Sequence, residues 1–184
     1  GADKEQNLIF ADLLQRKQSI QTAMDHKTAF LLICGGYQLF GQYYKDQDGN
    51  VIEGLKFFDY YTVAGNRDER CIGNIAVETT MDGKTFKAVG FENHGGQTKN
   101  VSTPFAKVLS GHGNEMHSGF EGFMNEQVLA TYMHGPLLPK NPDIADAILK
   151  RALKKRYGEV TLGPLDDTIE YQAQNVMLER LQCK

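Results

Sequence analysis

The stretch at residues 27–44, "KTAFLLICGGYQLFGQYY", joins a short apolar run to two glycines and then to an aromatic segment. The run 28–34 is bounded by polar residues, which is typical of a buried strand in a parallel sheet. Gly35 and Gly36 follow Cys34 directly, and the residues after them resemble the start of a helix. The stretch therefore predicts a strand, a tight turn at Cys34 and a helix.

This order of elements suits a nucleophile elbow, in which a reactive side chain occupies a tight turn at the carboxyl end of a strand. Small neighbours relieve crowding where the central residue has a strained backbone. We expect the first amides of the following helix, Gly35 among them, to lower the pKa of the Cys34 thiol. A buried structural cysteine is the commoner role of a free thiol, so the stretch alone leaves both interpretations open.

A thiol nucleophile needs a general base, which is usually a histidine. In "VLATYMHG", residues 128–135, His134 stands at the end of a buried-looking strand, where sites form in open α/β sheets. His26 lies in a predicted turn, His94 follows a strand and is ambiguous, and the glycine-rich region holds the two others, His112 and His117. We therefore expect Cys34 and His134 to form the catalytic pair.

The composition describes an ordinary globular chain of 184 residues, enough for one domain spanning 1–184. A net charge of -3 gives no basic excess for nucleic acid. No apolar run approaches the roughly 20 residues that span a membrane, and no signal peptide is present. Three widely spaced cysteines argue against a disulfide framework or a zinc site, so we expect a cytoplasmic protein in which Cys71 and Cys183 are structural or incidental.

Other patterns outline a single α/β domain. Asp82-Gly83 predicts a hairpin turn within a β-rich region, and the glycine-rich stretch 95–122 predicts loop or loose strand. The chain starts at "GADKEQ" without a methionine, so we expect an N-terminal part of the domain to precede it. Apolar spacing predicts helices over 3–26, with Asp3 as N-cap, over 143–158 and over 166–182.

Three separated motifs resemble a known family. "CGGYQLFG" at 34–41, "GFENHGG" at 90–96 and "TYMHGPLLPKNP" at 131–142 are similar to class I glutamine amidotransferases of the cobyric-acid-synthase-like (CobB/CobQ) branch. Within that branch, essentially the whole chain resembles the glutaminase subunits of lipid II isoglutaminyl synthases. The resemblance implies a flavodoxin-like three-layer sandwich, with a mostly parallel sheet between helices on both faces.

The resemblance also implies a reaction. The Cys34 thiolate would attack the side-chain amide of L-glutamine, and His134 would move the protons. Backbone N–H groups of Gly35 and of a turn at or just before Gly1 would hold the oxyanion. Most class I members carry a glutamate two residues after the histidine, but this chain has Pro136 there. The partner that orients His134 is therefore absent from its usual place.

The substrate-binding residues implied by the resemblance are Gln38, Arg70, Asn93 and His94, together with Gly35. Arg70 is favoured as the clamp for the α-carboxylate because R-x-x-G-N at 70–74 matches the family pattern, with Arg67 in reserve. Each arginine also suits an ordinary solvated loop. Asn93 and His94 either bind substrate or belong to a turn that the Asn side chain stabilises.

The sequence has no P-loop for ATP, so the resemblance implies a second polypeptide. This would be a Mur-ligase-like synthase subunit in a heterodimer, which binds ATP and Mg²⁺ and amidates the D-glutamate of lipid II to D-isoglutamine. The chain itself would need no cofactor. Pro136 suggests that the partner supplies the missing acid, although another acid of this chain, or a simple dyad, remains open. Two other functions also remain: a glutaminase for a cobyrinic-acid-type acceptor, and a non-catalytic scaffold.

Overall fold

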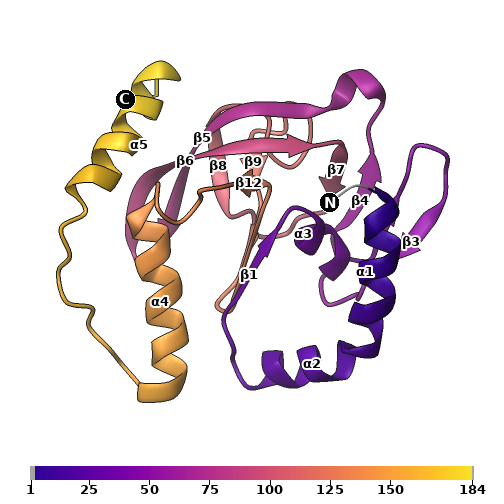
Figure 1. Ribbon diagram of the computed structural model, residues 1–184, viewed down its shortest axis with the longest axis horizontal. Coiled ribbons are helices and arrows are strands. Elements are labelled where there is room, and N and C mark those ends of the chain that lie inside the picture. Colours follow the sequence, from indigo (N-terminus) through magenta and orange to yellow (C-terminus); the bar gives the residue numbers. More distant parts are fainter. Residues whose placement is uncertain (1–2, 184) are drawn as a thin grey trace.

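The computed structural model describes residues 3–183, and the side chains within that range other than those of residues 3–8 and 67. It shows a mixed α/β fold in which three small sheets lie against α-helices (Figure 1). The side chains of Asp3, the predicted N-cap, and of Arg67 are therefore not described, and the predicted oxyanion turn at Gly1 lies outside the described residues.

The N-terminal segment forms two helices where one was predicted. The chain bends at Arg16, whose φ of -91° and ψ of -1° separate α1 (Asp3–Gln15) from α2 (Lys17–Asp25). The two helices run in different directions in Figure 1. Leu13 of α1 and Ile20 of α2 both pack against the buried cluster that contains Tyr37. The bend therefore lets two short helices cover one patch of core.

The first sheet contains the predicted strand before Cys34. Its order is β1 (Phe30–Ile33), β11 (Val128–Thr131) and β10 (Phe123–Met124). β1 and β11 run parallel with Ile33 opposite Thr131, whereas β10 and β11 are antiparallel. Because parallel strands end at the same edge, the residues that follow β1 and β11 come together there.

The second sheet is antiparallel and has the strand order β12-β6-β5-β8-β9. The predicted Asp82-Gly83 turn is confirmed, since φ values of 50° and 79° close the hairpin between Met81 and Lys84 as a primed turn does. The glycine-rich stretch is more ordered than expected, because it contributes β8 and β9. The strands are β5 (Cys71–Met81), β6 (Lys84–His94), β8 (Ala106–Ser110), β9 (Phe120–Glu121) and β12 (Met133–His134).

The third sheet lies beside the helix that follows Cys34. Its order is β3 (Val51–Glu53), β2 (Tyr43–Lys45), β4 (Tyr61–Ala64) and β7 (Gly96–Lys99). A 3-10 turn, η1 (Arg67–Glu69), connects β4 to β5. The helix α3 (Gly35–Phe40) packs against this region through its buried residues, so the predicted strand–turn–helix order is confirmed.

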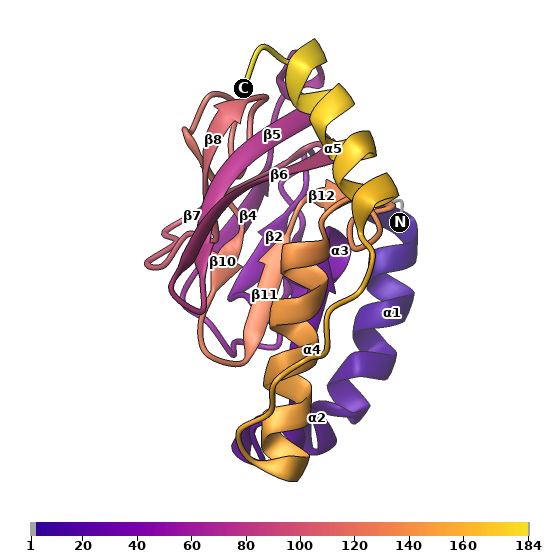
Figure 2. The same cartoon turned by 90° about the vertical axis from the view of Figure 1, so that its left-hand side faces the viewer.

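The prediction of a mostly parallel sheet is wrong for the described residues. Only β1–β11 and β2–β4 pair in parallel there, and the other pairings are antiparallel. The reason is local, because short connections such as the Asp82-Gly83 turn can join only antiparallel strands. Helices lie on both faces of the parallel pair β1–β11, with α1 and α2 on one face and α4 (Pro142–Tyr157) on the other (Figure 1). Figure 2 shows α5 (Thr168–Arg180) above α4. The expected helices on both faces are therefore present in the described residues, although most strand pairings are antiparallel.

The two C-terminal helices cover the antiparallel sheet. Ile144 and Ala147 of α4 join the main core cluster with Ile75, and Leu178 of α5 packs against Ala76 and Val89 on the opposite side of the same strand pair. Both helices were predicted from apolar spacing and are confirmed. None of the helices in residues 3–183 is long and apolar enough to cross a membrane.

Candidate active site

Cys34 occupies the turn between β1 and α3 in a strained conformation. Its φ of 51° and ψ of -105° lie in a region that residues other than glycine rarely adopt. Its backbone N–H donates to the Thr131 carbonyl at 2.9 Å, which ties the turn to β11. The local geometry is thus that of a nucleophile elbow, and the catalytic role of Cys34 stays a prediction.

The expected lowering of the Cys34 pKa is wrong. Burial raises the pKa of this thiol, and the opposing effects of the Gly35 backbone N–H and the Arg70 charge do not overcome it. The helix α3 has only 6 residues, so few aligned peptide dipoles face the sulfur. Cys34 is therefore mainly a neutral thiol before substrate and base act on it.

His134 stands at the edge of the sheets where Cys34 lies. It ends β12, three residues after Thr131, the last residue of the strand that pairs in parallel with β1, and both views place β12 near α3 (Figures 1 and 2). Burial lowers the pKa of His134. Its Nε2 is buried and has no hydrogen-bond partner in the described residues. A neutral imidazole with a free ring nitrogen suits a general base.

No carboxylate in the described part of the chain is hydrogen-bonded to Nε2 of His134. Pro136 is exposed and offers no side-chain acceptor. Glu92 lies opposite Met133 in the strand register, whereas His134 lies opposite Phe91, so Glu92 and His134 face opposite sides of the sheet. The Glu92 oxygens instead accept the backbone N–H groups of residues 112 and 113 at 2.8 and 3.0 Å.

Arg70 and Asn93 are brought together at the open end of the β5–β6 hairpin, opposite the Asp82-Gly83 turn. Nε and Nη2 of Arg70 donate to Oδ1 of Asn93 at 3.1 and 2.7 Å, and both side chains are exposed. The Arg70 charge also lowers the pKa of both Cys34 and His94, which places the guanidinium within electrostatic reach of the elbow. An exposed guanidinium that a side-chain hydrogen bond holds in place can bind a carboxylate.

Gln38 and His94 lie beneath the elbow and are each only 3% exposed. Nε2 of Gln38 donates to the Tyr132 hydroxyl at 3.0 Å. The His94 ring stacks on that of Tyr132 with centroids 3.6 Å apart, while its Nδ1 lies 2.7 Å from the Gly96 carbonyl. Gly96 must be small here, since an added Cβ would lie 2.4 Å from Nε2 of Gln38. Both predicted residues therefore support Tyr132 from inside the protein.

Three buried residues near the elbow were not singled out from the sequence: Glu121, Thr131 and Tyr132. Thr131 and Tyr132 were read only as strand residues before His134. Their hydroxyl groups on a buried strand were the available signal, because buried polar groups need partners. Glu121 is an isolated acid in the glycine-rich stretch, and no local pattern marks it.

The other two cysteines lie outside the turn after β1, and their assignment as structural or incidental stays a prediction. Cys71 is fully buried in β5, where burial raises the pKa of its thiol to about 11. The Cys183 thiol lies 3.2 Å from the Leu181 carbonyl near the end of the chain. Within residues 3–183, no group of three or more His, Cys, Asp or Glu side chains could hold a metal ion.

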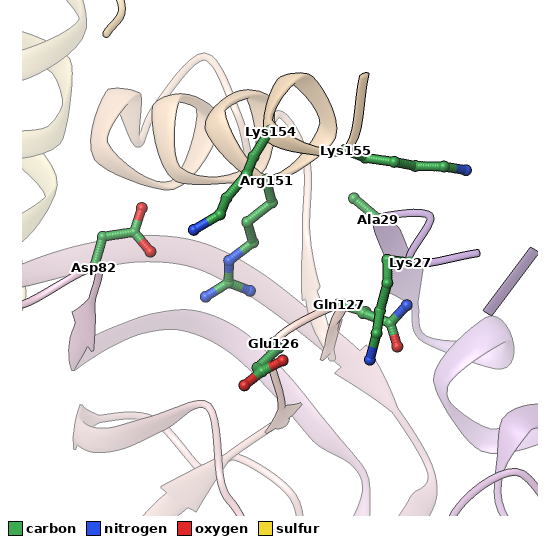
Figure 3. A pocket seen from close by; sticks show the side chains of 8 residues that line it. All are labelled: Lys27, Ala29, Asp82, Glu126, Gln127, Arg151, Lys154 and Lys155. Atoms are coloured by element: carbon green, nitrogen blue, oxygen red, sulfur yellow. The ribbon is translucent and has the colours of Figure 1, made fainter. Parts of the chain in front are cut away.

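A hollow of about 600 Å³ lies beside α4, away from Cys34 (Figure 3). Lys27 and Ala29, which line it, precede β1, whereas Cys34 follows that strand. Figure 3 shows Arg151 and Lys154 reaching into the hollow, with carboxylates on its other sides. Charges of both signs therefore share this space, and it is not the candidate active site.

Comparison with known proteins agrees with this geometry. The family of CobB/CobQ-like glutamine amidotransferase domains matches residues 1–142. The chain is 36% identical to subunit GatD of the glutamine-hydrolysing lipid II isoglutaminyl synthase of Staphylococcus aureus, over 98% of the chain and 72% of the relative. For GatD of Streptococcus pneumoniae the identity is 38%, over 94% of the chain and 66% of the relative.

A more distant relative is a probable cobyric acid synthase of Methanocaldococcus jannaschii, 32% identical over 78% of the chain and 31% of that protein. The two GatD matches cover most of the sequence. The elbow at Cys34 and the strand that leads to His134 agree with these matches. The chain belongs to the family of CobB/CobQ-like glutamine amidotransferases.

Proposed function

We propose that the protein hydrolyses L-glutamine to glutamate and ammonia, with Cys34 as nucleophile and His134 as general acid and base. One observation carries this proposal. Cys34 occupies a positive-φ turn, and its N–H is hydrogen-bonded to the strand that leads directly to His134. A structural cysteine would have no need of the strained turn, which costs about 1–3 kcal/mol.

The first half of the reaction forms a thioester. His134 takes the proton of the Cys34 thiol, and the sulfur attacks the side-chain carbonyl carbon of glutamine. A C–S bond forms while the carbonyl electron pair moves to oxygen, where the Gly35 N–H donates to it. The C–N bond then breaks, and His134 returns the proton to the leaving nitrogen, which departs as ammonia.

The second half regenerates the enzyme. Water attacks the γ-glutamyl thioester as His134 takes one of its protons, so that a C–O bond forms and the C–S bond breaks. The proton then passes from His134 to the Cys34 sulfur, and glutamate leaves. The lowered pKa of His134 keeps the imidazole neutral at neutral pH, which both halves require at their start.

Substrate recognition would come from the exposed side of the site. Arg70, held by Asn93, binds the α-carboxylate of glutamine, and Gly35 serves the oxyanion. Gln38 and His94 are nearly fully buried, so we assign them to the support of the elbow through Tyr132. For Gln38 or His94 to contact the substrate glutamine, its side chain would have to move away from Tyr132.

We further propose that the ammonia serves amidation of lipid II. Both GatD relatives are subunits of lipid II isoglutaminyl synthase, and they match nearly the whole chain. The protein would act in the cytoplasm in a heterodimer with a Mur-ligase-like subunit, MurT. That partner would use ATP and Mg²⁺ to activate the D-glutamate α-carboxylate, and this chain would carry no cofactor. A cobyrinic-acid-type acceptor is the alternative, since a probable cobyric acid synthase is a weaker match.

Pro136 stands where most class I members have a glutamate, and no carboxylate of the described residues is hydrogen-bonded to Nε2 of His134, which supports a role for the partner in catalysis. We propose that an acid of the synthase subunit approaches His134 in the complex and orients its ring. Glutaminase rates that are equal with and without the partner would contradict this proposal.

The test is glutamate release from L-glutamine by the full-length protein, alone and with the partner. Cys34→Ala should lower kcat/KM at least about 10³-fold, as expected for loss of a nucleophile. Cys183→Ala removes a thiol far from the elbow and should leave the rate unchanged. If Cys34→Ala keeps wild-type activity, Cys34 is not the nucleophile and the proposed mechanism is wrong. If no combination releases glutamate, the protein is a scaffold and not a glutaminase.

A further inference from the structure

The chain changes sheets within one residue just before His134. β11 pairs with β1 as far as Thr131, and β12 pairs with β6 from Met133 onward, so that Tyr132 alone lies between them. We call Thr131–Met133 the junction. Backbone N–H groups at such a change leave one ladder before they enter the next, and when buried they need other partners.

The buried carboxylate of Glu121 supplies these partners. From β9, its Oε1 accepts the Tyr132 N–H at 2.6 Å and its Oε2 accepts the Thr131 hydroxyl at 2.9 Å. All three residues are 0% exposed, so no water competes at this point. Burial of a carboxyl group costs free energy unless the group is hydrogen-bonded, and residues 131 and 132 of the junction supply both of these hydrogen bonds.

Thr131 links the Glu121 carboxyl group to the backbone on both sides of the site, at Cys34 and next to His134. Its hydroxyl oxygen accepts the Met133 N–H at 3.0 Å, next to His134. Its carbonyl accepts the Cys34 N–H at 2.9 Å. A single residue held by Glu121 therefore contacts the backbone of the nucleophile and the backbone beside the base.

From these contacts we infer that Glu121 is a positioning residue, whose carboxyl group fixes the junction and thereby the placement of His134 relative to Cys34. The inference rests on the proposed function, because it takes Cys34 and His134 as the reacting pair. Glu121 lies on β9, behind the junction, and acts through Thr131 and Tyr132.

The chemistry of the group defines a conservative replacement. Burial raises the pKa of Glu121 to about 8, the two hydrogen bonds partly oppose this, and Glu92 adds to the rise. At neutral pH the carboxyl group is mainly protonated, and its two oxygens accept the Tyr132 N–H and the Thr131 O–H. A glutamine amide keeps an oxygen for the Tyr132 N–H, and its NH₂ group can donate to the Thr131 hydroxyl once that hydroxyl has rotated. Leucine can do neither.

The test compares Glu121→Gln, Glu121→Leu and a matched control in the full-length protein. Glu121→Leu should lower kcat for glutamine hydrolysis about 10- to 100-fold, the effect of misplacing a catalytic group by ~1 Å. KM should stay within about 3-fold, because Arg70 and Asn93 bind outside the junction. Glu121→Gln should keep kcat within about 3-fold of wild type. Glu92→Gln alters an equally buried carboxyl group whose hydrogen bonds go to the backbone N–H groups of residues 112 and 113 and not to the junction.

A second readout does not depend on activity. The ring resonance of His134 can be followed by NMR against pH in protein with labelled histidine, and assigned with His134→Asn. Glu121→Leu should raise the His134 titration midpoint toward that of a solvated histidine, while Glu121→Gln and Glu92→Gln leave it in place. If Glu121→Leu does not fold, Thr131→Val against Thr131→Ser tests the same hydroxyl, and only the Val variant should lose kcat.

Unchanged kcat and an unchanged His134 midpoint in folded Glu121→Leu would overturn the inference, as would a loss in KM alone. A loss in Glu121→Gln as large as that in Glu121→Leu would also overturn it. If the wild type hydrolyses no glutamine but the His134 midpoint moves as expected, the proposed function fails and the positioning role stands.

Discussion

The proposed nucleophile side of the site, at Cys34, and the proposed substrate side, at Arg70 and Asn93, are built on different sheets and by different means. Cys34 lies at the end of a buried parallel strand pair, in a strained turn whose N–H is bonded to β11. Arg70 and Asn93 lie exposed at the end of an antiparallel hairpin, where two side-chain hydrogen bonds hold them. Buried geometry should therefore control kcat, and the exposed pair should control KM.

Replacement of Arg70 tests this division most directly. Arg70→Met removes the proposed carboxylate clamp, and a hydrogen bond to a charged group contributes about 1.5–3 kcal/mol. KM for glutamine should rise about 10- to 100-fold with kcat nearly unchanged. Steady-state kinetics of glutamate release measure both constants. Arg151→Met, in the hollow beside α4, removes an arginine far from Cys34 and should change neither.

A fall in kcat at unchanged KM for Arg70→Met would contradict the comparison. It would show that the arginine acts on the transition state, and the two sides of the site would then not divide the work as proposed.

The backbone behind the junction offers a test of stability. Gly122 follows Glu121 with a φ of 66°, and an added Cβ would lie 2.4 Å from the Ala130 carbonyl oxygen. Gly122→Ala should lower the free energy of unfolding by about 1–3 kcal/mol, through backbone strain and overpacking. Gly83→Ala is the matched control, because its φ is 79° but nothing lies within 4 Å of the new atom.

Urea unfolding of the two glycine variants separates strain from crowding. A larger loss in Gly122→Ala would show that the close approach of residue 122 to β11 is itself constrained. Equal losses of unfolding free energy in the two variants would mean that the backbone near residue 122 shifts to accommodate the added Cβ, so that this side of the site is less rigid than its burial indicates.

The nucleophile side was largely predictable because its signals are local. The apolar run, Cys34 and the glycine pair are contiguous, and the Asp82-Gly83 turn is encoded by two residues. His134 was found because the strand before it is continuous in sequence. The pair Arg70 and Asn93 came only from the resemblance, since their hydrogen bonds join residues 23 positions apart.

What the sequence did not predict depends on contacts between distant segments. Glu121 shows no periodic pattern, and its role follows from the approach of β9 to β11. The glycine-rich stretch was predicted as loop or loose strand, because its short strands are ordered by pairing and not by their own residues: β8 pairs with β5, and β9 pairs with β8. The mostly parallel sheet was expected from the family fold, but the strands from residue 71 onward pair mainly as antiparallel hairpins.

The smallest expected effect concerns the charge of the nucleophile itself. Burial raises the pKa of Cys34 above the ordinary thiol value of 9.0, while Gly35 and Arg70 act weakly in the other direction. A raised pKa means less thiolate at neutral pH, so iodoacetamide should label Cys34 more slowly than an exposed cysteine and faster as pH rises past 9.0. Peptide mass spectrometry of labelled protein measures this profile residue by residue.

Arg70→Met extends the same profile across both sides of the site. Removal of a nearby positive charge should move the labelling midpoint of Cys34 to higher pH, because the thiolate loses a favourable interaction. An unmoved midpoint would place the guanidinium too far from the sulfur to affect its ionisation. A midpoint near neutral pH in the wild type would instead mean that the helix amides outweigh burial, and that the elbow activates Cys34 before glutamine binds.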